Sequence, residues 1–289
     1  MTAVARLTLQ NFRSYPALDL AIEGRLVALC GENGTGKTNL LEALSLFAPG
    51  RGLRRADLSE MVRQPGDGGF AVSIGLADEG SRLGIGLEPP DAEGRRARIA
   101  RINGTPAGSA LAFSDYVRLV WLTPDLDGLF RGAAGDRRRF LDRLVLAVDP
   151  GHGTRSNALE KALRSRNRLL DESPHQQRWL DAVEREIAEL GVAVAAARAE
   201  TVARLSAIIA QTSDEASPFP QADIALEGEI DALVASLPAL DAEDRYRELL
   251  REMRPRDKAA GRTLAGPQAS DLAVRHVAKI GRASCRERV

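Results

Sequence analysis

The sequence predicts an α/β fold over roughly its first 125 residues and a region rich in helices after that. Short runs that alternate apolar and polar residues, typical of half-buried strands, fill the first part. A glycine-rich turn that begins at Gly31 joins an apolar run to a helical pattern. From Asp136 onward, apolar residues recur every three or four positions, which indicates helices.

Composition narrows the class of protein. The chain has 289 residues, 44% of them hydrophobic, which suffices for one large or two modest domains. Since no apolar run is long enough to span a membrane and no signal peptide begins the chain, we expect a cytoplasmic protein without a membrane partner. Two cysteines and three dispersed histidines form no metal cluster. The 40 acidic and 40 basic residues give a net charge of zero, which argues against a uniformly basic nucleic-acid-binding protein. A local basic patch remains compatible with this charge.

Two strands are predicted before the glycine-rich turn, at residues 4–9 and 18–22, with a turn at 10–16 between them. The apolar run 26–30 predicts a third strand, which leads directly into the turn. Two short strands in this position suit a fold in which an antiparallel layer covers the base of a bound nucleotide.

Residues 31–38 match the phosphate-binding pattern G-x-x-x-x-G-K-[ST], between a predicted strand and a predicted helix. Glycines let the backbone approach phosphate and aim N–H groups at it, and the helix adds its positive dipole end. Lys37 would reach the terminal phosphates, and Thr38 would complete a Mg²⁺ shell of water and phosphate. Almost all basic residues of this chain are arginine, so a lysine at position 37 is unusual for its composition. A P-loop uses the compact ammonium group of lysine, which the guanidinium of arginine does not replace.

The alternative, a glycine-rich turn with a surface lysine, is disfavoured because both flanks also fit the pattern. ATP and Mg²⁺ are therefore the expected cofactors, with Thr38 as the metal ligand. The predicted nucleotide-binding residues are Gly31, Glu32, Asn33, Gly34, Thr35, Gly36, Lys37, Thr38 and Asn39.

A basic loop follows the predicted helix and carries Arg51, Arg54 and Arg55. These arginines could contact phosphates of nucleotide or DNA, or simply form a solvated loop, and both readings stay open. Further strands are predicted at residues 70–76, 83–87, 95–102 and 117–122, with a short helix at 111–116.

Helices are predicted at residues 136–146, 154–170, 176–211, 231–237 and 242–253, with a Pro- and Ser-containing linker at 213–220. Residues 271–277 return to strand alternation, and we expect this strand to rejoin the first sheet. The predicted organisation is an α/β lobe of residues 1–125 and 256–279 that carries a helical lobe of residues 126–255.

Three consecutive arginines, Arg137 to Arg139, open the first of these helices. They are candidates for phosphate contacts, although they span only part of a helical turn and cannot all face one way. Surface arginines beside a core-facing Phe140 and Leu141 are an equally good interpretation.

A P-loop ATPase usually has a second acidic element, an apolar strand that ends in Asp or Asp-Glu. Three Asp-Glu pairs occur. Asp78-Glu79 follows a half-exposed strand, Asp171-Glu172 follows a helical stretch, and Asp214-Glu215 lies in a polar linker. None fits the required context, so no catalytic residue is assigned.

Residues 31–44 closely resemble the P-loop of the RecF family, the ABC/SMC-like ATPases of bacterial recombinational repair. Four other segments are also similar to the family and occur in the family's order: 7–15, 124–126, 137–142 and 166–170. With them the resemblance extends over almost all of residues 3–277. Gly266-Pro267 with Asp271-Leu272 is similar to a late family motif. Residues 268–270, Gln-Ala-Ser, depart from the usual His-Arg, so no role is carried onto them.

The resemblance implies a P-loop ABC-type ATPase head, a mixed-sheet lobe with an inserted helical lobe. It also implies DNA replication and repair: ATP-dependent homodimerisation, binding to single-stranded DNA and single/double-strand junctions, recombination mediator partners, gap repair and SOS induction. In the family, a signature motif and an acidic Walker B strand follow the Gly-Pro motif, and this sequence stops before them. Poor or absent ATP turnover is therefore expected.

The last ten residues, 280–289, break the strand pattern, and one back-translation of them resembles a sequencing adapter. We expect a non-native tail that truncates the natural sequence near Ala278. A nucleotide-binding or DNA-binding module without ATP turnover is the alternative function. A small-molecule P-loop kinase is less favoured because no acceptor site or lid is apparent.

Overall fold

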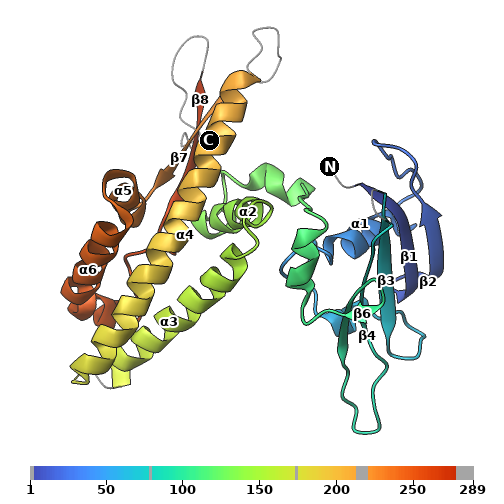
Figure 1. Ribbon diagram of the computed structural model, residues 1–289, viewed down its shortest axis with the longest axis horizontal. Helices are drawn as coiled ribbons and strands as arrows, with labels where there is room; N and C mark the ends of the chain where they lie inside the picture. Colours follow the sequence, from blue (N-terminus) through green and yellow to red (C-terminus); the bar gives the residue numbers. More distant parts are fainter. Residues whose placement is uncertain (1–2, 78–79, 173–174, 213–220, 278–289) are drawn as a thin grey trace. The chain divides into compact units, whose positions relative to one another are not determined.

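A six-stranded antiparallel sheet forms the first unit of the computed structural model (Figure 1). Its order is β2-β1-β3-β4-β5-β6. Strands β1 to β6 span Val4–Phe12, Tyr15–Ala21, Phe70–Leu76, Arg82–Leu87, Arg98–Ile102 and Thr105–Pro106. The structure describes residues 3–77, 80–172, 175–212 and 221–277, and the chain divides into two units, residues 1–121 and 122–289.

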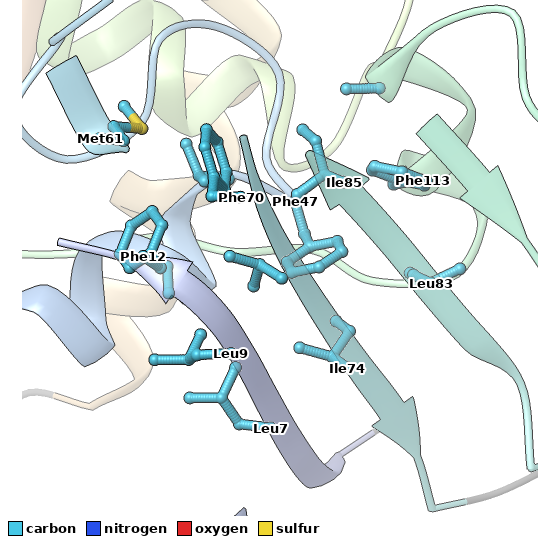
Figure 2. Packing of buried hydrophobic residues seen from close by; sticks show 14 of the residues in the cluster. Leu7, Leu9, Phe12, Phe47, Met61, Phe70, Ile74, Leu83, Ile85 and Phe113 are labelled. Carbon is cyan, nitrogen blue, oxygen red and sulfur yellow. The ribbon is translucent and has the colours of Figure 1, made fainter. Parts of the chain in front are cut away.

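Alternation along the strands turns every second side chain into one core (Figure 2). The register aligns these side chains in two rows across β1, β3 and β4: Leu9, Val72 and Ile85, then Leu7, Ile74 and Leu83. All six are at most 2% exposed. Burial of each such side chain contributes roughly 1.5–3 kcal/mol relative to exposure, so this register fixes which face of the sheet is covered.

Helix α1, Lys37–Ser45, contributes Leu40 and Ala43 to this core. Two short 3-10 helices, η1 at Leu58–Met61 and η2 at Ala110–Asp115, add Met61 and Phe113. The ring of Phe113 lies 5.4 Å from that of Phe47, just after α1 (Figure 2). Apolar packing therefore holds the start of α1, and with it the glycine-rich turn, against the sheet.

Two predicted strands do not form. Residues 26–30 and 117–122 have no regular secondary structure. Leu26 is 96% exposed and Leu122 is 81% exposed. A strand requires a neighbour for its backbone groups, and no described strand pairs with either segment. Apolar content alone predicted these strands, and it could not supply the partner.

Five α-helices and a two-stranded ribbon make up the described part of the second unit. Helices α2 to α6 span Ala134–Leu146, His152–Glu172, Gln177–Gln211, Glu229–Ser236 and Ala239–Ala260, after a 3-10 helix, η3, at Pro124–Gly128. Helices α3, α4 and α6 share a core that includes Leu159, Ile187 and Leu250. Gly191 of α4 permits close packing of Tyr246, since a Cβ there would lie 2.7 Å from the Tyr246 ring.

All five predicted helices of this unit are confirmed, four of them within two residues at each end, whereas α6 continues seven residues beyond the predicted end at 253. Strand β8, Asp271–Val277, is also confirmed, but its predicted return to the first sheet is wrong, because it pairs with β7, Gln221–Glu227, which was not predicted. Residues 256–277, assigned by sequence to the α/β lobe, thus lie in the second unit. The predicted linker 213–220 and tail 280–289 fall outside the described residues. No described helix is both long and apolar enough to cross a bilayer.

Candidate nucleotide-binding site

The predicted phosphate-binding loop leads directly into α1. Gly36 caps this helix with φ 97° and ψ 4°, a left-handed conformation. A Cβ at this position would lie 2.8 Å from Tyr15 Oη, so glycine is required both for backbone conformation and for space. The N–H of Asn39 donates to the carbonyl of Gly36 at 2.8 Å, and the helix begins there. Its first N–H groups have no helical acceptor, which creates a positive end suited to an anion.

Lys37 lies folded over the loop. Its Nζ donates to the carbonyls of Gly31 and Glu32, each at 2.7 Å. Thr35 Oγ1 donates to the same Glu32 carbonyl at 2.9 Å. The loop is therefore closed by its own hydrogen bonds, and phosphate oxygens would compete with these two carbonyls for the ammonium group.

Thr38 is the second residue of α1, and it is exposed. Within the described ranges, no group of three or more His, Cys, Asp or Glu residues could hold a metal ion. The side chains present fit a Mg²⁺ ion that is bound by the Thr38 hydroxyl and otherwise by phosphate and water, as in P-loop sites.

The turn between β1 and β2 borders the phosphate-binding loop. Tyr15 Oη donates to the carbonyl of Thr35 at 3.4 Å. Asn39 Nδ2 donates to Ser14 Oγ at 2.9 Å. Ser14 of this turn and Tyr15, the first residue of β2, therefore contact the first turn of α1 and the loop, so the first strand pair positions the predicted site.

A buried carboxylate on α1 joins two arginines that are distant in the sequence. Glu42 is 0% exposed. Arg13 donates to it from Nε at 2.9 Å and from Nη2 at 2.7 Å. Arg54 Nη1 donates to Glu42 at 2.7 Å and to Asn39 Oδ1 at 2.9 Å. Sequence reasoning assigned no role to Glu42 or Arg13, although a charged residue between Leu40 and Ala43 on the buried helix face was an available signal.

The arginines of the basic loop divide into two kinds. Arg51 has a side chain 71% exposed and lies 3.6 Å from the carboxylate of Asp57. Arg55 is also exposed. Arg54 instead turns toward α1 and bonds to Glu42 and Asn39. Only Arg54 is thus brought to the predicted nucleotide site.

The three arginines at the start of α2 have partners within the second unit. Arg137 makes a two-pronged bond to Asp271, at 2.7 and 2.8 Å. This bond holds the pKa of Asp271 below its usual value. Arg138 donates to the carbonyl of Ser270 at 2.7 Å, and Arg139 pairs with Asp136. Arg137 therefore ties α2 to β8, as the structural interpretation of these arginines requires.

Comparisons with known proteins agree with this geometry. A family model described as an AAA domain matches residues 6–78, which include the loop and α1. The fold and the glycine-rich turn that opens α1 define a P-loop ATPase fold.

Named relatives narrow this class. "DNA replication and repair protein RecF" of Mesorhizobium japonicum is 53% identical over 275 residues, which cover 95% of this chain and 72% of the relative. The Brucella abortus protein of the same name is 48% identical over 277 residues, covering 95% and 71%. This chain therefore belongs to the RecF family of DNA replication and repair proteins.

Solved structures agree on the fold. A structure described as "the recombination mediator protein RecF-ATPrS in RecFOR pathway" matches with a TM-score of 0.80 at 21% identity, covering 94% of this chain and 73% of the other. The corresponding RecF-ATP structure matches with a TM-score of 0.79 at 20% identity, covering 95% and 73%. The predicted fold class, a P-loop ATPase head with a large helical region, is confirmed.

Proposed function

We propose that residues 31–39 bind ATP with Mg²⁺ and that nucleotide binding controls the association of this chain with DNA during recombinational gap repair. The observation that carries the proposal is the N-terminus of α1, where Gly36 opens the helix and Lys37 Nζ lies 2.7 Å from two loop carbonyls. An ammonium group and free helix N–H groups at one point match a triphosphate.

We assign a different role in ATP binding to each chemical group of the loop. Backbone N–H groups after Gly34 and Gly36 hold phosphate oxygens, and Lys37 moves from the loop carbonyls to the β- and γ-phosphates. The Thr38 hydroxyl contributes one ligand to Mg²⁺, which would neutralise phosphate charge. ATP turnover is assigned to no residue of this chain, so the proposal concerns binding.

DNA, as single strands or single/double-strand junctions, is the proposed macromolecular partner, together with recombination mediator proteins and a second copy of the chain. Both structures of similar fold carry ATP or ATPrS in their descriptions, and both descriptions name a recombination mediator. If ATP joins two copies, nucleotide state and DNA affinity become coupled through dimer formation. We propose that this takes place in the cytoplasm and supports SOS induction.

Substitution of the loop lysine tests nucleotide binding. ATP–Mg²⁺ at one hundred times its Kd should stabilise the wild-type chain by about 2.7 kcal/mol, measured as a rise in Tm. Lys37→Ala should abolish this rise because the γ-phosphate loses its ammonium partner. Lys161→Ala, an exposed lysine of α3, is the matched control and should keep the full rise. An unchanged ATP response in Lys37→Ala would reject the site.

Salt dependence tests DNA binding. Phosphate contacts release counterions, so affinity for a fluorescent gapped DNA should fall steeply between about 50 and 200 mM salt. A flat response across that range would rule out phosphate contacts as the basis of binding.

A further inference from the structure

The face of the first sheet that lies opposite its core has a floor of small residues. Since Leu7 and Leu9 point into the core, the residues that alternate with them point outward. The register places these outward residues in two rows across β1, β3, β4 and β5: Thr8, Ser73, Gly84 and Arg101, then Gln10, Ala71, Gly86 and Ile99. Every residue that β3 and β4 contribute to the rows is glycine, alanine or serine. The middle of this face is therefore little more than backbone.

An open groove of about 310 Å³ follows this floor and is lined by both rows. A second hollow, of about 430 Å³, covers β1 and β2 and shares Thr8, Leu9 and Gln10 with the first. Together they form one depression across β2, β1, β3, β4 and β5, here called the outer furrow. Neighbouring strands are about 4.8 Å apart, so the outer furrow is roughly 19 Å long, enough for about six residues of extended chain.

Two glycines keep the outer furrow open for different reasons. A Cβ at Gly86 would lie 2.4 Å from the carbonyl oxygen of Phe70, so the neighbouring strand leaves no room for a side chain. A Cβ at Gly84 would lie 3.9 Å from Arg101 Cβ and 4.0 Å from the Val72 oxygen, which are ordinary contacts. A strand glycine packs nothing and often marks a place where another backbone approaches closely. The described neighbours do not require glycine at position 84, so its bare backbone suits an external chain.

The charges of this face favour an anionic partner at one end. Arg6 bonds to Asp19 at the β1–β2 end, at 2.6 Å from Nε. Arg82 and Arg101 are exposed on adjacent strands, and the described contacts give neither of them a carboxylate partner; Arg82 makes only a long bond to Ser73 Oγ, at 3.3 Å. As diagonal neighbours the two arginines are about 7–8 Å apart. Residues two apart in an extended chain point the same way at a spacing of about 7 Å, so two acidic residues separated by one other match this pair.

A protein segment fits the outer furrow better than a nucleic acid does. Neither row contains an aromatic residue on which bases could stack. Because Asp19 neutralises Arg6, the β2 end offers no net positive charge to a continuous phosphate backbone. The free positive charge is confined to the β4–β5 end, and the floor between the two ends is uncharged. A short acidic stretch followed by small or apolar residues has the complementary pattern.

We propose that the outer furrow is a docking site for an extended acidic segment of a partner protein. Two carboxylates of the segment bind Arg82 and Arg101, and the rest of its chain crosses the strands directly over Gly84 and Gly86. Helix α1 packs on the inner face of the same sheet, so this site and the proposed ATP site lie on opposite faces. The inference goes beyond the proposed binding of ATP and DNA and depends on neither.

Titration of the 289-residue chain with a synthetic peptide, Asp-Ala-Asp-Leu-Ala-Gly, tests the site. With ¹⁵N-glycine labelling, the backbone N–H signals of Gly84 and Gly86 should shift as the peptide is added. The neutral peptide Asn-Ala-Asn-Leu-Ala-Gly should leave them in place. Gly84→Val fills the furrow with ordinary contacts and a residue that favours strands, so the fold is kept while the peptide-dependent shift of Gly86 is abolished.

Charge reversal in the same strand provides a matched pair of variants. Arg101→Glu should weaken the peptide at least tenfold, because a charged hydrogen bond is replaced by repulsion. Arg98 is equally exposed, but it pairs in register with the core residue Leu87 and so belongs to the other face. Arg98→Glu should therefore leave the peptide affinity unchanged. Both substitutions are at exposed positions, so folding should survive them.

Three results would overturn the proposal. The first is that the acidic peptide leaves the Gly84 and Gly86 signals unmoved at millimolar concentration. The second is an equal loss of affinity in Arg98→Glu and Arg101→Glu, which would mean that only overall charge matters. The third is displacement of the peptide by gapped DNA together with weaker DNA binding in Arg101→Glu, which would make the outer furrow a nucleic-acid contact.

Discussion

Buried charged residues shared by partners of opposite sign occur in both units, and Glu42 and Arg166 differ in sign and in surroundings. In the first unit, Glu42 is shared by Arg13 and Arg54, and Arg54 stays 41% exposed. In the second unit, Arg166 is shared by Glu184 and Asp257, and all three side chains are 0% exposed. The first cluster keeps a positive surplus and open donors, whereas the second is closed on all sides.

The contacts of Arg166 explain the difference. Its guanidinium donates to Glu184 at 2.9 Å, to Asp257 at 2.7 Å and to the carbonyl of Leu250 at 2.6 Å. Arg254 also bonds to Glu184 and to Asp181, and Arg251 bonds to Asp181, so three cations balance three anions. Completed bonds and balanced charge identify a structural cluster that joins α3, α4 and α6. Arg54, by contrast, keeps exposed surface and donors beyond the bonds that it makes to Glu42 and Asn39.

Removal of Arg166 should have the largest effect. Arg166→Met leaves Glu184 and Asp257 buried without this partner, which should cost about 3–5 kcal/mol in the free energy of unfolding. Urea unfolding followed by circular dichroism measures it. Arg164→Met is the control on the same helix, since Arg164 is 68% exposed and its bond to Glu160 is 3.5 Å long. A loss below about 1 kcal/mol for Arg166→Met would remove the distinction between the two clusters.

The P-loop pattern, and the start of α1 just after it, could be predicted from the sequence because the pattern is local. Gly36, Lys37 and Thr38 must follow one another at fixed spacing, whatever the rest of the chain does. Strands β1 and β3 and the long helix α4 were also predictable, because alternation and 3.6-residue periodicity are carried by neighbouring residues.

Features that depend on distant partners were not predictable in the same way. Residues 26–30 have the composition of a strand, but a strand forms only beside another strand. Strand β7 alternates as Ala222, Ile224 and Leu226, a signal that the adjoining Pro- and Ser-containing linker obscured. The bond between Arg54 and Glu42 joins the basic loop to α1, and spacing alone does not specify it.

An intermediate effect is expected at the pair that ties α2 to β8. The hydrogen bond from Arg137 lowers the pKa of Asp271, so Asp271 contributes stability that is complete above the unfolded-state pKa, about 3.9. This stability is lost as pH falls below that value and through the lower pKa of the folded state. Asp271→Asn should therefore cost about 2 kcal/mol at neutral pH. Urea unfolding at several pH values measures this difference.

At about pH 3 and below, the difference between wild type and Asp271→Asn should shrink, because the wild-type carboxylate becomes protonated. Asp136→Asn provides the control, since Asp136 is 52% exposed where it pairs with Arg139. An equal loss from both variants at neutral pH would mean that burial of the Arg137 pair adds nothing.

The smallest effect, of opposite sign, is expected at Asp231 in the first turn of α5. Asp231 is 7% exposed, and neither carboxylate oxygen has a well-formed hydrogen bond. Burial raises its pKa, and Arg198 is already bonded to Asp142 at 2.8 and 2.9 Å.

A raised pKa means that the folded state favours the protonated form, so the charge present at neutral pH costs stability. The helix dipole offsets this by about 0.3–1 kcal/mol, which is less than the 1–3 kcal/mol cost of an unpaired buried polar group. Asp231→Asn should therefore stabilise the chain by about 1 kcal/mol at neutral pH, and the gain should vanish below about pH 3.9, where the carboxyl is protonated in both states. Exposed Glu229 in the same turn feels only the dipole, so Glu229→Gln should destabilise slightly. Destabilisation of Asp231→Asn at every pH in a urea titration would instead show that this carboxylate is paired in solution, as Glu42 and Glu184 are.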